Sequence, residues 1–412
     1  MRQRLTVSWV GRSLELEIGP VGHGGFCVAR HEGRVVFVRH SLPGELVRAL
    51  VTEDRGGGYC RADAVEVLAA APGRVVPPCP VAGPGGCGGC DFQHVDHATQ
   101  RDLKAAVVAE QLQRIAGLSV AVDVEALPGG PLRWRTRTRL AVDDSGRAGF
   151  RVHRSHEVVP VDDCPITLSG ALDGMPARRW RPGSELEVAV DADGAVHQAQ
   201  LRPGRPAVRF RGSGRVVREA AGRRFETGAH GFWQVHPAAA GVLAGIVAEW
   251  AGAPDGGTAW DLYGGVGLFG SVLASQVGAT GSVTVVESSR RAVADGEAAL
   301  ADLPQVRFVR GQVASVLSHP RPTRLREDPA VVVLDPPRRG AGKDVAAAVA
   351  ACGPQRVVHV ACDPAALARD VAAFVAGGYR LTALRALDTF PMTHHVECVA
   401  LLERGRSHVG VR

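Results

Sequence analysis

The sequence has no long apolar run in its 412 residues. Its longest apolar runs, such as Val331–Leu334 and 346–351, are far shorter than the roughly 20 residues that a membrane-spanning helix needs. The opening stretch, MRQRLTVSWVGR, lacks the apolar core of a signal peptide. Internal repeats and low-complexity tracts are also missing from the sequence. We therefore expect a cytoplasmic protein with no membrane partner.

The sequence also lacks the composition of a disordered chain. Hydrophobic residues make up 45% of it and charged residues only 22%, so it can bury a sizeable core. Its length exceeds that of one compact domain, which predicts two or three domains. The sequence does not specify an oligomer, and a monomer is the default expectation.

Charge of one sign is not in large excess. Lys and Arg total 48 against 42 for Asp and Glu, which gives a net charge of +6. This is compatible with a polyanionic partner but does not by itself indicate one. The arginines are unevenly spread, because Arg133, Arg135, Arg137 and Arg139 alternate with other residues. A period of two places four guanidinium groups on one face of a strand, which favours RNA-phosphate binding over a merely solvated face.

The nine cysteines do not form a disulfide framework, because their number is odd and no secretion signal precedes them. In a reducing compartment, clustered cysteines indicate a metal site or catalysis. The clustered thiols are Cys79, Cys87 and Cys90 in PCPVAGPGGCGGC, and Cys164 in VDDCPIT. Three close cysteines with one distant cysteine are typical of a cubane 4Fe-4S iron–sulfur cluster. Zinc, with His94 or His97 as a further ligand, is the alternative.

Three regions differ in their pattern of secondary structure. Residues 1–70 contain short strands broken by glycine, which predicts a small OB-like antiparallel β-barrel. Residues 71–230 contain a linker rich in Pro and Gly, a helix over 96–116 and a mixed, strand-rich part. Residues 231–412 alternate helices with seven short strands. This alternation predicts a Rossmann-like α/β domain with a seven-stranded, mostly parallel sheet.

A glycine-rich turn follows the first strand of the α/β region, in DLYGGVGLFG at 261–270. Its glycines let the backbone approach a ligand at the carboxyl ends of the strands. The second strand ends in Glu287, where a carboxylate can accept hydrogen bonds from both ribose hydroxyls. These two features predict a cofactor that contains a nucleoside. The fourth strand ends at Asp335, before two prolines that make a rigid loop of the kind found in enzymes that methylate planar bases.

The fifth strand ends at Cys362, directly before the start of a helix. The helix N-terminus would favour the ionised thiol of a nucleophile, whereas a buried cysteine acting as a small apolar residue is the alternative. Glu397 lies in an otherwise apolar strand of the last hairpin. Because burial of a carboxylate is costly, we expect either a general base with a raised pKa or a salt bridge to an arginine.

These motifs together resemble those of the RNA uridine-5-methyltransferases, which act on transfer RNA or 23S ribosomal RNA. The segments FWQV, DLYGGVG, LDPPR, VACDPAALARD and FPMTHHVE occur in the family's order, and the resemblance covers nearly the whole chain. It implies a class I, S-adenosylmethionine-dependent methyltransferase domain at 231–412 and an RNA-binding TRAM domain at 1–70. The ribosomal-RNA branch of the family has an iron–sulfur cluster in a similar CGGC context. The resemblance therefore favours ribosomal RNA over transfer RNA as the partner.

The resemblance also implies roles for single residues. Cys362 would add to carbon 6 of uracil, and Glu397 would remove the proton from carbon 5 after methyl transfer. The target uridine must leave its stack to reach such a site. The residues implied in binding the cofactor or the target base are Gln234, Tyr263, Gly265, Glu287, Gln312 and Asp335.

The sequence departs from the family's usual residues at four positions. Gly264 stands where the family usually has a cysteine, and Leu268 where it often has an asparagine. Gln312 stands near a position where the family often has an acid, and Asp363 stands where an asparagine usually follows the nucleophile. These departures concern cofactor contacts and leave the two reactive residues intact. The alternatives are a non-catalytic iron–sulfur RNA-binding protein and a methyltransferase that acts on an amine.

Overall fold

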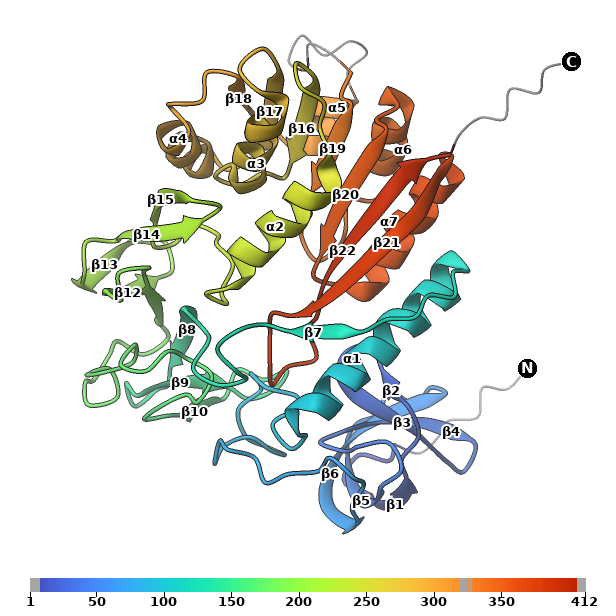
Figure 1. Cartoon of the computed structure of the whole chain (residues 1–412). Helices are drawn as coiled ribbons and strands as arrows, with labels where there is room; N and C mark the ends of the chain where they lie inside the picture. Colours follow the sequence, from blue (N-terminus) through green and yellow to red (C-terminus); the bar gives the residue numbers. More distant parts are fainter. Residues whose placement is uncertain (1–7, 319–324, 326–327, 406–412) are drawn as a thin grey trace, which may run out of the picture.

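The computed structural model of the chain describes residues 8–318, 325 and 328–405. These residues form four β-sheets with helices packed mainly around the largest sheet (Figure 1). No helix in these residues is both long enough and apolar enough to cross a membrane.

The first sheet is built by the N-terminal strands in the order β1-β5-β6-β4-β3-β2. These strands are β1 (Ser13–Glu17), β2 (Val21–Gly22), β3 (Phe26–His31), β4 (Arg34–Arg39), β5 (Leu46–Glu53) and β6 (Tyr59–Ala69). Buried and exposed residues alternate along β1, β4 and much of β5. The edge strand β1 also contacts β3 near the opposite edge, so the sheet curls around one apolar core, as the prediction of a barrel requires.

The middle of the chain forms a second six-stranded sheet, in the order β10-β9-β8-β11-β12-β13, and a separate hairpin. The strands of the sheet are β8 (Arg137–Val142), β9 (Ala148–Arg151), β10 (Val158–Pro160), β11 (Glu185–Val190), β12 (Val196–Arg202) and β13 (Arg205–Arg211). The hairpin consists of β14 (Arg215–Ala220) and β15 (Arg223–Gly228). The segment between this hairpin and α2 (Ala239–Ala251) leads into the C-terminal domain.

The largest sheet has the strand order β18-β17-β16-β19-β20-β22-β21-β7. Its strands are β7 (Val124–Ala126), β16 (Thr258–Leu262), β17 (Ser282–Glu287), β18 (Val306–Arg310), β19 (Val331–Leu334), β20 (Arg356–Ala361), β21 (Tyr379–Asp388) and β22 (Glu397–Arg404). The predicted seven-stranded, mostly parallel sheet is confirmed, with β22 antiparallel to its neighbours. The edge strand β7 was not predicted, because three residues show no alternation. An ion pair between Glu125 and Arg385 at 2.6 Å joins it to β21.

Helices cover both faces of this sheet, as expected for an α/β domain. Val332 of β19 points into one apolar core and Val333 into the other, which explains why the strand is apolar throughout. The remaining helices are α3 (Leu268–Val277), α4 (Arg290–Ala299), α5 (Val313–Leu317), α6 (Lys343–Cys352) and α7 (Pro364–Ala376).

The helix predicted over 96–116 is confirmed as α1 (His97–Gln111), followed by a π-helical turn, η1 (Leu112–Ala116). Asp96 caps its N-terminus by accepting hydrogen bonds from the backbone of Ala98 and Thr99. The helix contacts α7 of the C-terminal domain and β2 of the first sheet. It therefore lies between the first sheet and the C-terminal α/β domain (Figure 1).

Candidate active site

A cavity of about 1130 Å³ lies at the carboxyl ends of the parallel strands of the largest sheet. This is the usual place for a ligand in an α/β domain, because the loops that follow successive strands converge at that edge of the sheet. All eight residues predicted to bind the cofactor or perform the chemistry line this cavity. They are Gln234, Tyr263, Gly265, Glu287, Gln312, Asp335, Cys362 and Glu397.

The glycine-rich turn and the end of β17 form one part of the cavity wall. The backbone N–H of Gly265 donates a hydrogen bond to Oε2 of Glu287 at 3.2 Å, and that of Ser289 donates to Oε1 at 2.5 Å. These bonds hold the Glu287 carboxylate beside the turn, which is the position required of a ribose acceptor.

The glycine at position 264 is required by close packing. A Cβ atom there would lie 2.5 Å from Cγ1 of Val285 and 2.7 Å from the carboxyl carbon of Asp261. Asp261 is buried beneath the turn and accepts a hydrogen bond from the backbone of Gly270 at 2.7 Å. Burial raises the pKa of Asp261 to about 7. A larger side chain at 264 would displace this carboxyl group.

Three acidic side chains face one another in another part of the cavity: Asp335 after β19, Cys362 after β20 and Glu397 at the start of β22. Burial raises the pKa of Asp335 to about 7. Burial, and then the charge of Asp335, raises the pKa of Glu397 well above its ordinary value. Glu397 forms no ion pair in the part of the chain that the structure describes. Its surroundings are therefore those of a carboxyl group with a raised pKa and not those of a salt bridge.

The expectation that the helix N-terminus favours ionised Cys362 is wrong for the enzyme without ligands. Burial, and then the charges of Glu397 and Asp335, raise the pKa of this thiol to about 12. In addition, the carboxylate of Asp363 already caps α7, since it accepts a hydrogen bond from the backbone of Ala366 at 2.8 Å. The cap offsets the positive end of the helix dipole near the sulfur.

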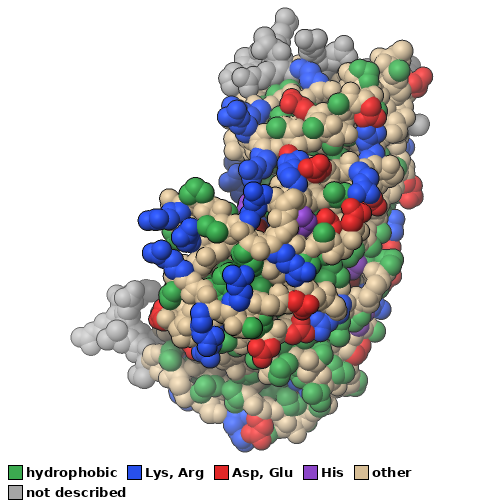
Figure 2. All heavy atoms as spheres, turned by 90° about the vertical axis from the view of Figure 1, so that its left-hand side faces the viewer, with side chains coloured by type: hydrophobic (Ala, Val, Ile, Leu, Met, Phe, Trp, Pro, Cys, Tyr) green, Lys and Arg blue, Asp and Glu red, His purple; other side chains and the backbone are tan. Residues whose placement is uncertain are grey.

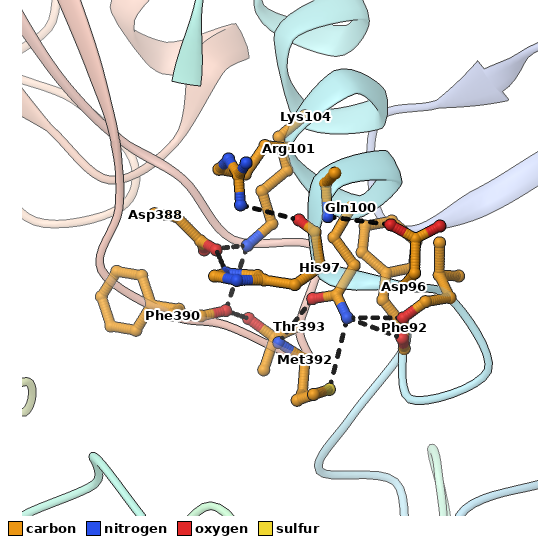
Figure 3. A network of polar contacts seen from close by, with 12 residues as sticks. Phe92, Asp96, His97, Gln100, Arg101, Lys104, Asp388, Phe390, Met392 and Thr393 are labelled. Carbon is orange, nitrogen blue, oxygen red and sulfur yellow. Dashed lines mark hydrogen bonds and ion pairs between the residues drawn. The ribbon is translucent and has the colours of Figure 1, made fainter. Parts of the chain in front are cut away.

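The segment between β21 and β22 leads to Glu397 and is held by α1 through a buried polar network (Figure 3). Nζ of Lys104 lies 2.5 Å from Oδ1 of Asp388 and donates a hydrogen bond to the carbonyl of Phe390 at 3.1 Å. Nε2 of His97 lies 2.8 Å from the other carboxylate oxygen of Asp388. Lys104 and Asp388 are both fully buried. No spacing in the sequence could reveal this pairing, because its partners lie far apart in the chain.

A second part of the same network holds the middle of this segment. The side chain of Gln100 accepts a hydrogen bond from the backbone of Met392 at 2.8 Å and donates one to the carbonyl of Val95 at 2.8 Å (Figure 3). His394 Nδ1 lies 2.6 Å from Oδ2 of Asp91. Although burial of Asp91 opposes it, the hydrogen bond with His394 holds the pKa of this carboxyl at about 2.

The first sheet touches the segments that carry both reactive residues. Nε2 of His23, in the turn between β2 and β3, lies 3.0 Å from Oδ2 of Asp363. A Cβ atom on Gly25 of the same turn would lie 2.7 Å from Cβ of His394. The N-terminal sheet therefore forms part of the support of the cavity, which the sequence did not indicate.

The arginine run at 133–139 differs from the prediction. Strand β8 begins only at Arg137, and Arg133 has a left-handed backbone with φ 56°, so the four side chains do not share one strand face. Arg137 lies 2.6 Å from Glu187, Arg133 lies 2.5 Å from Asp163, and Arg139 lies 3.3 Å from Glu185. Only Arg135 of the four lines the cavity. The RNA-binding role of all four arginines stays a prediction.

The four clustered cysteines come from two segments that the fold brings together. Burial, and with a smaller effect the charge of Cys164, raises the pKa of Cys79, Cys87 and Cys90. The side chain of Gln93 donates a hydrogen bond to Sγ of Cys90 at 3.2 Å. In the described residues, however, no three His, Cys, Asp or Glu side chains are arranged to hold a metal ion. Four thiols that lie near one another nevertheless offer the type of ligand that an iron–sulfur cluster requires.

The parallel sheet, its glycine-rich turn and the acids at the strand ends define a class I methyltransferase. A solved structure with the same fold is the tRNA (uracil-54, C5)-methyltransferase of Pyrococcus abyssi in complex with S-adenosyl-L-homocysteine. It has a TM-score of 0.68 and 21% sequence identity, over 94% of this chain and 99% of its own.

Residues 7–65 match the family model of the TRAM domain, and residues 256–405 match that of tRNA (Uracil-5-)-methyltransferase. An uncharacterized RNA methyltransferase of Streptomyces avermitilis is 46% identical over 96% of this chain and 99% of its own length. A 23S rRNA (uracil(1939)-C(5))-methyltransferase of Alkalilimnicola ehrlichii is 33% identical over 95% and 96%, respectively. The chain belongs to the S-adenosylmethionine-dependent RNA uracil-5-methyltransferases.

The buried ion pair can be tested by replacing Lys104 with methionine. Lys104→Met leaves Asp388 in a buried site with His97 as its remaining partner, so we expect the free energy of unfolding to fall by about 3 kcal/mol. Urea denaturation measures this change. Arg101→Met on the same helix is the control, because Arg101 donates only to the carbonyl of His97, and its effect should stay within about 0.5 kcal/mol. Equal losses for the two variants would contradict the assignment.

The raised pKa of Cys362 predicts slow alkylation of the enzyme without RNA or cofactor. Because the thiolate reacts and the pKa is about 12, labelling by iodoacetamide should keep rising with pH through about 10. A short unstructured peptide with one internal cysteine, the control, should level off above the ordinary cysteine pKa of about 8.5. Mass spectrometry of the labelled peptide gives the rate. A plateau for Cys362 below pH 8 would show that the thiolate is already stabilised.

Proposed function

We propose that this enzyme methylates carbon 5 of a uridine in 23S ribosomal RNA through a covalent bond from Cys362 to carbon 6. The observation that carries the proposal is the single cavity shared by Cys362, Glu397 and the six residues predicted to bind cofactor or base. The relative from Alkalilimnicola ehrlichii is named for a uracil of 23S ribosomal RNA, and the similarity extends over 96% of its length. This similarity supports ribosomal RNA as the substrate.

The raised pKa values give the reaction its order. S-Adenosylmethionine supplies the methyl group on a positively charged sulfur. A positive charge in the cavity would lower the pKa of Cys362, Asp335 and Glu397 together, because burial raises the pKa of each and acidic neighbours raise those of Cys362 and Glu397 further. The thiolate and the carboxylate therefore become available when the cavity is filled.

Cys362 and Glu397 then perform the bond changes. The thiolate adds to carbon 6 of the uracil, and the electron pair of the double bond makes carbon 5 nucleophilic. Carbon 5 takes the methyl group as the bond from that group to the sulfonium sulfur breaks, and S-adenosylhomocysteine is the leaving group. Glu397 accepts the proton that carbon 5 still holds, the double bond re-forms, and the bond from carbon 6 to sulfur breaks to return the thiolate.

The cavity wall also suits a base that has left its stack. Phe232 is 69% exposed and lines the cavity, so its ring is open to stacking on a nucleotide. Arg135 lines the same cavity from the central region. An exposed aromatic ring and a cation in one cavity are features that single-stranded RNA binds.

We further propose that Cys79, Cys87, Cys90 and Cys164 hold a 4Fe-4S cluster, with zinc as the alternative. The hydrogen bonds to Sγ of Cys90 from Gln93 and to Sγ of Cys87 from the backbone of Gly89 support thiolate ligands. Methyl transfer needs no redox step. Because Gly88 and Gly89 of this loop line the cavity, the cluster would act by holding the wall that receives RNA.

The covalent mechanism predicts different outcomes for its two reactive residues. Cys362→Ala should abolish methylation of unmodified 23S ribosomal RNA transcribed in vitro. Glu397→Gln should allow methyl transfer but trap an enzyme–RNA adduct, since the proton on carbon 5 is not removed. Denaturing gels and the adduct mass measure both results. Cys352→Ala, at the end of α6, is the control and should turn over normally. An active Cys362→Ala enzyme would exclude the covalent route.

The cluster predicts a visible absorption band near about 400 nm in protein purified without oxygen. Cys87→Ser and Cys164→Ser should each remove the band and the bound iron. Cys60→Ser, in the core of the first sheet, should keep both. Metal analysis decides between the two proposals, because stoichiometric zinc without the band would exclude the iron–sulfur cluster.

A further inference from the structure

A second cavity, of about 420 Å³, opens beside the active-site cavity. It lies between β13, the β14–β15 hairpin and α4, and we call it the lateral groove. Its lining residues are Ala207, Arg209, Ser213, Gly214, Arg215, Gly228, His230 and Arg291. Three of these eight are arginines and none is an acid. The volume is in the range of pockets that take small ligands or parts of larger ones.

Two glycines allow arginine side chains to lie in the groove. A Cβ atom on Gly214 would lie 2.7 Å from Cδ of Arg209, and one on Gly228 would lie 3.2 Å from Cδ of Arg291. The side chain of each arginine therefore packs directly against the backbone of a glycine, where any larger residue would crowd it. Both arginines are exposed and line the groove, so their side chains are accessible to a ligand there.

In the part of the chain that the structure describes, Arg209 and Arg291 form no ion pair with Asp or Glu, and Nη1 of Arg209 donates a hydrogen bond to the carbonyl of Ser213. Arg215 differs, because it lies 2.8 Å from Glu226 and 2.7 Å from Asp295. An exposed guanidinium group without an acidic partner can bind a phosphate through two hydrogen bonds. The arginine run at 133–139 lacks this property at three of its four positions.

The lateral groove is continuous with the active-site cavity. His230 and Arg291 line both of them. Figure 2 shows the face of the molecule that carries β13, β14 and α4, and Lys and Arg side chains gather on its left and upper parts. A chain that leaves the active-site cavity past Arg291 enters the groove directly.

We propose that the lateral groove binds the phosphate backbone of the RNA strand next to the target uridine, through Arg209 and Arg291. The inference rests on the proposed function, since it requires an RNA strand with one base in the active-site cavity. The groove offers cations but few groups that could read base edges, so its contribution is independent of base sequence.

The salt dependence of RNA binding tests this proposal. The probe is a fluorescein-labelled, unstructured RNA of about 15 nucleotides that contains uridine, and anisotropy gives its affinity from about 50 to 200 mM KCl. Arg209→Ala should weaken binding about fivefold and lower the slope of log affinity against log salt by about 0.7. Arg291→Ala should do the same. Arg209→Lys should keep most of the slope.

Arg205→Ala is the matched control, because Arg205 is exposed on the same strand and lines neither cavity. It should leave affinity and slope unchanged. An unchanged salt slope in Arg209→Ala, or an equal loss of affinity in Arg205→Ala, would contradict phosphate binding in the lateral groove. Binding of S-adenosylhomocysteine, measured by calorimetry, shows that each variant is folded. If the wild type transfers no methyl group, the proposed function fails, while the binding comparison still decides on the groove.

Discussion

Burial of acidic side chains in one cavity, reinforced at Cys362 and Glu397 by the charges of their acidic neighbours, is the constraint on which the proposed chemistry depends. Cys362, Asp335 and Glu397 come from three different strands, and a negative charge on one raises the pKa of its neighbours. In the enzyme without ligands, the neutral forms of the Cys362 thiol and the Glu397 carboxyl group are therefore favoured. Under the proposed mechanism, a cationic methyl donor would favour the ionised forms, so that the reactivity of these groups would depend on occupancy of the cavity. A neutral thiol is also less open to oxidation while the enzyme waits for its substrates.

The rest of the structure holds these groups at one point. The sheet supplies the ends of β19 and β20, while α1 fixes the segment before Glu397 through Lys104 and Asp388. The first sheet reaches the helix that follows the nucleophile through His23 and Asp363. Parts of the chain more than 280 residues apart in sequence thus meet at the same site. The N-terminal barrel, which matches the TRAM domain, therefore also supports the active-site cavity.

Much of the site could be predicted from the sequence, because residues that directly follow parallel strands meet at one sheet edge. Glu287, Asp335 and Cys362 were found by this rule alone. The arginine run could not be interpreted in the same way, since its acidic partners Glu187 and Glu185 lie on a neighbouring strand some fifty residues away. The lateral groove was equally hidden: its arginines lie on separate elements, and only packing brings them together.

The most direct test of the account follows the hydrogen at carbon 5. RNA transcribed with tritium at carbon 5 of its uridines is incubated with the enzyme and S-adenosylmethionine that carries a labelled methyl group. Methylation at carbon 5 with removal of the proton by Glu397 predicts one tritium released to water for each methyl group gained. Methyl transfer without tritium release would place the methyl group on another atom and contradict the proposed mechanism.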